Sequence, residues 1–100
     1  MRLTRTLRFK KAKINEKHYG YGFNSSSTYD VVSDGAIVKK IIELCKQNNA
    51  EVIRINLSDN DSWFCEHDCF VKIKAYKKDF INIVNEFTLH FIKYIQNIRY

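Results

Sequence analysis

The chain has 100 residues, a formal net charge of +6 and 45% hydrophobic residues. This length supports one domain, residues 1–100, with a buried core, and the hydrophobic content excludes a disordered chain. No apolar run reaches the roughly 20 residues that cross a bilayer, and the N-terminus lacks the apolar stretch of a signal peptide. Three cysteines, an odd number, fit reduced thiols, so we expect a cytoplasmic protein.

The net charge is concentrated near the N-terminus. Residues 1–17 hold seven cations against Glu16 alone, whereas basic and acidic side chains balance over residues 18–100. A cationic segment beside a neutral body predicts an anionic partner, of which nucleic acid is the commonest. Two alternatives stay open: a solvated edge strand kept soluble by its charges, and a segment that docks on an acidic protein surface.

The basic segment itself has the pattern of a strand. Over residues 2–13, apolar side chains alternate with cations and threonines, which predicts a strand with a cationic outer face. Arg5 and Lys11 fall on the apolar face, so we expect this strand at a sheet edge or frayed at its ends.

A turn at residues 15–17 predicts a second short strand over residues 18–23. The two strands would form a basic hairpin over residues 2–23. The rest of the core is then expected over residues 33–100.

A helix and a hairpin are predicted next. Ser33 is typical of a helix N-cap, and Asn48 of a helix end. Residues 51–58 alternate, with Ile53 on the apolar face. Alternation resumes at Trp63 after a polar tip, which predicts an antiparallel hairpin.

The last predicted element is a helix over residues 77–99. Its apolar residues are spaced alternately by three and four positions. This spacing places them along one side of a helix, where they can pack against another element. At 1.5 Å per residue it would be roughly 34 Å long, and it is apolar on more than one side. Either the first helix or a second subunit would cover the apolar side chains that do not face the sheet. We favour the second subunit, in a homodimer through residues 77–99.

The predicted order is therefore strand, strand, helix, strand, strand, helix (β-β-α-β-β-α). Two helices on one face of a mainly antiparallel sheet is the economical architecture. We predict an α+β fold, a two-layer sandwich.

Residues 17–23 read Lys-His-Tyr-Gly-Tyr-Gly-Phe, with three aromatics and two glycines in alternation. This run resembles the aromatic-glycine strand motif of RNA-recognition and cold-shock domains, in which flat rings stack bases beside cations. It departs from that motif at His18 and Tyr19, where glycine should follow the cation, so the chain is assigned to neither family. The alternative is that glycines admit a close-packed helix and the rings belong to the core.

The cysteine and histidine residues are weak candidates for a metal site or a catalytic site. Cys65, His67 and Cys69 share one face of a predicted strand, but a structural zinc site needs four ligands that wrap the ion. We therefore expect buried thiols, with no metal and no cofactor. His18, beside lysine and tyrosines, is the one constellation suited to a small ribonuclease, which leaves catalysis open. No nucleotide-binding loop or nucleophile elbow is present, which favours a non-enzyme.

These patterns predict a small non-catalytic nucleic-acid-binding protein, with RNA favoured over DNA. The predicted contact residues are Arg2, Arg5, Arg8, Lys10, Lys11, Lys13, Lys17, Tyr19, Tyr21 and Phe23. The alternative is a protein-binding inhibitor or regulator from a phage or mobile element, a source that fits the abundant Lys, Ile and Asn. It would dock by the basic strand or the long C-terminal helix. Exposed rings beside the arginines would favour nucleic acid, and buried rings a protein partner.

Overall fold

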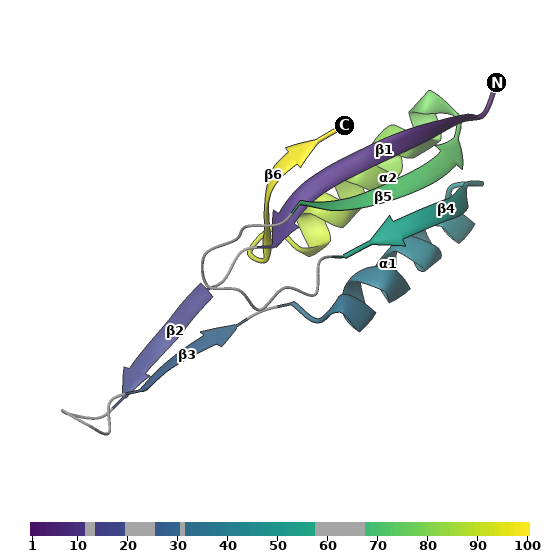
Figure 1. Ribbon diagram of the computed structural model, residues 1–100. Helices are drawn as coiled ribbons and strands as arrows, with labels where there is room; N and C mark the ends of the chain where they lie inside the picture. Colours follow the sequence, from purple (N-terminus) through teal and green to yellow (C-terminus); the bar gives the residue numbers. More distant parts are fainter. Residues whose placement is uncertain (12–13, 20–25, 31, 58–67) are drawn as a thin grey trace.

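The described part of the chain contains both strands and helices, with three strands before the first helix. The computed structural model describes residues 1–11, 14–19, 26–30, 32–57 and 68–100. Within these ranges the elements are β1 (Leu3–Lys11), β2 (Ile14–Tyr19), β3 (Ser26–Asp30), α1 (Asp34–Gln47), β4 (Glu51–Asn56), β5 (Cys69–Ala75), α2 (Lys77–His90) and β6 (Ile95–Arg99) (Figure 1).

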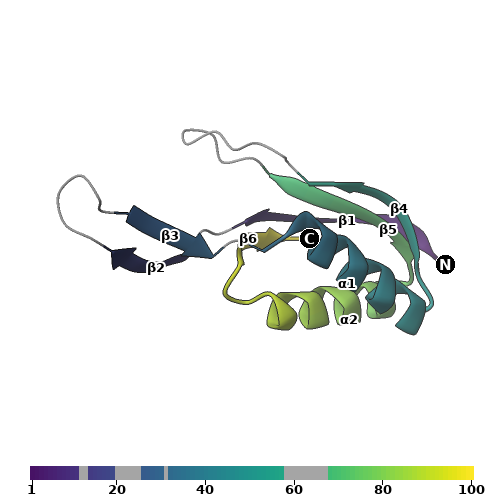
Figure 2. The same cartoon turned by 90° about the horizontal axis from the view of Figure 1, so that it is seen from below.

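Four of the strands form one sheet in the order β4-β5-β1-β6, and each neighbouring pair is antiparallel. Figure 2 shows α1 and α2 on the same face of this sheet. β2 and β3 pair with each other in a separate two-stranded sheet. The predicted α+β fold, with two helices on one face of an antiparallel sheet, is confirmed. The element order differs because β3 and β6 were not predicted.

The core lies between the sheet and the helices. Leu7 and Phe9 of β1 are fully buried, and every second residue of β5 from Cys69 to Ala75 is buried as well. Phe9 meets Phe87 of α2 with ring centroids 5.2 Å apart. Burial of these apolar side chains on one face of each strand fixes which residues point away from the helices.

The ends of α1 are those that the sequence predicts. The Ser33 hydroxyl oxygen accepts a hydrogen bond from the Ala36 backbone N–H at 3.1 Å. At the other end, Asn48 is the C-cap and Asn49 has a φ of 51°, a left-handed conformation that asparagine tolerates. Burial of Ile37, Leu44 and their neighbours places α1 against the sheet.

β4 and β5 form the predicted antiparallel hairpin, but with a bulge in β4. Val52 pairs with Ile73 and Arg54 with Lys72, so Ile53 is an extra residue. Ile53 is exposed, contrary to the expectation that it faces the core, and Val52 packs there instead. Residues 58–67, which include the expected tip and the start at Trp63, lie outside the described residues.

The predicted helix over residues 77–99 is wrong in its second half. α2 ends at His90, a turn follows, and the chain returns as β6 beside β1. Arg8 pairs with Arg99 and Lys10 with Gln96, so β6 has one residue more than β1 between these pairs. Asn97 has a φ of 53° and accounts for this bulge.

The bulge explains why β6 has the spacing of a helix. Ile95 is buried and Ile98 packs on the core, although residues three apart on a regular strand face opposite sides. The bulge turns both inward. Phe91 is also buried in this core, whereas Leu89 and Ile92 are 70% and 63% exposed, so the homodimer through residues 77–99 stays a prediction.

β1 is an interior strand, contrary to the edge position predicted for it, since it pairs with both β5 and β6. The two cations on its apolar face, Arg5 and Lys11, each interact with another part of the same chain. The Arg5 side-chain Nε donates to the Ala75 carbonyl at 3.3 Å, and Lys11 forms an ion pair with Asp34. The predicted turn at residues 15–17 lies within β2, which pairs with β3 and not with β1.

Candidate nucleic-acid interface

No described helix covers the second face of the four-stranded sheet, which we call the outer sheet face (Figure 2). The side chains that alternate with the core residues of each strand lie on it. They are Thr4, Thr6, Arg8 and Lys10 of β1, Glu51, Arg54 and Asn56 of β4, Phe70, Lys72 and Lys74 of β5, and Gln96 and Arg99 of β6. Cations therefore come to this face from every strand of the sheet.

Strand register places like charges opposite each other on this face. Arg8 is paired with Arg99, and Arg54 is paired with Lys72. Side chains of directly opposed residues have Cβ atoms about 5 Å apart, and like charges in such positions destabilise a sheet by up to roughly 1 kcal/mol. The fold therefore brings positive charges together on this face, where they repel one another.

Few carboxylates offset this charge. Asp68 forms an ion pair with Arg99 at 2.8 Å, and Glu51 is paired with Lys74 in the strand register. Within the described ranges, no carboxylate lies within 4.0 Å of the charged groups of Arg8, Arg54 or Lys72. The outer sheet face thus has an excess of cations that can contact phosphate groups.

Phe70 lies at the centre of these cations. The guanidinium carbons of Arg8 and Arg54 are 5.6 and 5.8 Å from its ring centroid, and the Lys72 ammonium nitrogen is 5.8 Å from it. These distances are near the limit of about 6 Å for a cation–π contact, which contributes about 0.5–1 kcal/mol at an exposed site. The contacts are thus similar in size to the repulsion between the cations and leave little net stabilisation.

The structure places the predicted contact residues on different surfaces of the molecule. Arg8 and Lys10 lie on the outer sheet face, and Arg2 precedes β1 and is half-buried. Arg5 and Lys11 are on the helix side, with the partners described above.

None of the remaining predicted residues belongs to a described strand of the four-stranded sheet. Lys17 and Tyr19 belong to β2, which is in the other sheet. Lys13, Tyr21 and Phe23 lie outside the described residues.

The sequence analysis missed Arg54, Phe70, Lys72, Lys74 and Arg99. A signal for four of them existed, because Arg54 falls on the polar side of its strand and the other three alternate with Cys69, Val71 and Ile73. Charge counted along the chain does not reveal them, because residues 18–100 have no net charge. That balance holds along the chain but not on the outer sheet face.

The side chains of Cys45, Cys69 and His90 form no metal-binding cluster in the described part of the chain. Cys45 and Cys69 are free thiols in the core, and burial raises the pKa of Cys45 to about 11. The ring of His90 packs against Phe91 with centroids 4.6 Å apart. Within the described ranges, no three His, Cys, Asp or Glu side chains are placed to hold a metal ion. Cys65 and His67, named as metal-ligand candidates, lie outside those ranges.

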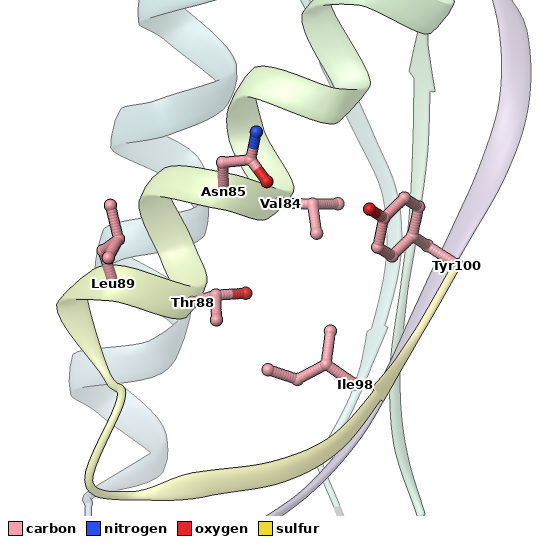
Figure 3. Close-up of a pocket in the computed structure, with 6 residues that line it drawn as sticks. All are labelled: Val84, Asn85, Thr88, Leu89, Ile98 and Tyr100. Atoms are coloured by element: carbon pink, nitrogen blue, oxygen red, sulfur yellow. The ribbon is translucent and has the colours of Figure 1, made fainter.

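A shallow groove of about 540 Å³ lies between α2 and the C-terminal strand. Figure 3 shows Ile98 and Tyr100 projecting toward Val84 and Thr88 of α2. Leu89 lines the same groove and is 70% exposed. The lining combines apolar side chains with the uncharged polar groups of Asn85, Thr88 and Tyr100 and holds no carboxylate, imidazole or ammonium group.

Comparisons with protein-family models, with curated proteins and with solved structures found no match. A search of the described helices for one long and apolar enough to span a bilayer found none. Functional inference therefore depends on the outer sheet face and its chemistry.

Proposed function

We propose that this protein is a small non-catalytic nucleic-acid-binding protein of the cytoplasm and that the outer sheet face is its binding surface. The observation that supports this most strongly is the pairing of Arg8 with Arg99 and of Arg54 with Lys72 on a face that no described helix covers. The repulsion between like charges placed opposite each other is relieved when an anion binds between them.

A polyanion fits this surface better than a single small anion. The cations come from four strands, and neighbouring strands are about 4.8 Å apart, so they extend over more than one phosphate group. We favour RNA over DNA, as the sequence analysis did. The proposed contact residues are revised to Arg8, Lys10, Arg54, Lys72 and Lys74, with Arg99 held by Asp68 until a phosphate competes for it.

Charge-matched variants test this proposal. The face variant carries Arg8→Gln, Arg54→Gln and Lys72→Gln. The helix variant loses the same charge through three substitutions at exposed lysines of α1 and α2, Lys39→Gln, Lys46→Gln and Lys78→Gln. Both are compared with the unaltered protein by fluorescence anisotropy, using an unstructured RNA of about 12 nucleotides at about 50 mM salt.

We expect the face variant to bind about tenfold or more weakly, and the helix variant to bind within about twofold of the unaltered protein. Equal losses in both variants would mean that only net charge matters, and would contradict a defined site. No binding of RNA or DNA by the unaltered protein at low salt would reject the function. A protein partner, docking by the basic strand or by the C-terminal segment of residues 77–99, would then become the better hypothesis.

A further inference from the structure

Phe70 is a large aromatic residue on the outer sheet face, where charged and polar side chains otherwise prevail. Its neighbours in β5, Cys69 and Val71, are buried in the core, so the Phe70 ring lies on the opposite side of the sheet and is only half-buried. β5 is an interior strand between β4 and β1. The ring therefore has a neighbouring strand on each side, near the end of the sheet where β5 begins and β4 ends.

Cations flank this ring on both neighbouring strands. Arg54 of β4 and Arg8 of β1 are 5.8 and 5.6 Å from the ring centroid, on strands that lie one spacing to either side of β5. Because strands are about 4.8 Å apart, these two arginines are separated by roughly 10 Å across the sheet. A base that lies on the ring would have its flanking phosphates within reach of both.

This arrangement discriminates between single and double strands. In a duplex both faces of each base are covered by its neighbours, so a ring on a sheet can reach only bases that are unstacked. Cations alone would bind either form, since both carry phosphates. A flat ring between the cations adds an interaction that only a single strand can make, and every base offers a π-face for it.

We propose that Phe70 is a base-stacking platform and that the outer sheet face takes single-stranded nucleic acid in preference to duplex. This inference rests on the proposed function. Stacking of one base on an aromatic side chain typically raises affinity by about 5- to 150-fold. Phe70→Leu keeps apolar bulk but removes the flat ring, whereas Phe70→Tyr keeps the ring.

The experiment measures binding of one labelled RNA of about 12 nucleotides, alone and annealed to its complement, to the unaltered protein and to both Phe70 variants. We expect Phe70→Leu to lower single-strand affinity by at least about fivefold and to leave duplex affinity within about twofold. Phe70→Tyr should retain both affinities. Thermal unfolding of each variant confirms that it is folded under the conditions of the assay.

The outcomes separate this inference from the function that underlies it. Salt-dependent binding of both RNA forms with no effect of Phe70→Leu would overturn the stacking role and leave nucleic-acid binding standing. Equal affinity of the unaltered protein for both forms would also overturn it. Failure to bind either form at about 50 mM salt would reject the proposed function itself.

Discussion

The bulge at Asn97 determines which side chains of β6 face the core and which face the outer sheet face. Asn97 has a φ of 53°, and the bulge keeps Ile98 against the core while Arg99 is paired with Arg8. A left-handed residue that is neither glycine nor asparagine typically costs about 1–2 kcal/mol. The variant Asn97→Val is therefore expected to lower the free energy of unfolding by about that amount. Asn97→Gly should stay within about 0.5 kcal/mol of the unaltered protein, because glycine adopts this conformation without a steric cost.

Urea denaturation followed by far-UV circular dichroism measures these differences. In a domain of this size, 1–2 kcal/mol corresponds to roughly 4–16 °C in melting temperature. Gln96→Val is the control, since Gln96 is exposed on the same strand and β-branched residues are favoured in regular strands. Equal stability of Asn97→Val and Asn97→Gly would refute the bulge and, with it, the placement of Arg99 opposite Arg8.

Three further predictions concern capping, the buried thiol and salt. Ser33→Ala should lower stability by about 1 kcal/mol, because the Ala36 N–H loses its acceptor, and thermal unfolding measures this loss. The folded state holds the Cys45 proton more tightly than the unfolded state does, so the contribution of this thiol to stability is constant below about pH 9 and declines as pH rises toward 11. This decline, about 2–3 kcal/mol, should be absent from the pH profile of Cys45→Ala measured by urea unfolding. For binding to single-stranded RNA, the slope of log affinity against log salt is measured between about 50 and 200 mM salt. This slope should be smaller in magnitude by about two in the face variant than in the unaltered protein, and unchanged in the helix variant.

The parts of the fold that could be predicted have local signals. Ser33 before an apolar stripe defines the start of α1, strict alternation defines β5, and a less regular alternation indicates β1 and β4. These signals arise from capping and from burial on one face, which depend on residues close together in the chain.

The parts that could not be predicted depend on long-range pairing. α2 ends at His90 with no glycine or proline after it, and β6 forms because β1 offers an unpaired edge. The bulge at Asn97 gives β6 the three-residue spacing of a helix, so periodicity alone favours the wrong element.

The candidate site was predicted only in part for the same reason. Arg8 and Lys10 could be assigned to a cationic face from the alternation of β1 alone. Their association with Arg54, Phe70 and Lys72 requires the order β4-β5-β1, which brings together residues more than forty positions apart in the chain. Charge counted along the sequence does not contain this information.

Backbone amide chemical shifts, followed by NMR during titration with a single-stranded RNA of about 12 nucleotides, locate the binding surface most directly. The predicted result is that the largest changes fall on β1, β4 and β5 around Arg8, Arg54 and Phe70, with little change along the solvent side of α1 and α2. Changes concentrated on the helices or in the groove between α2 and β6 would contradict a nucleic-acid interface on the outer sheet face.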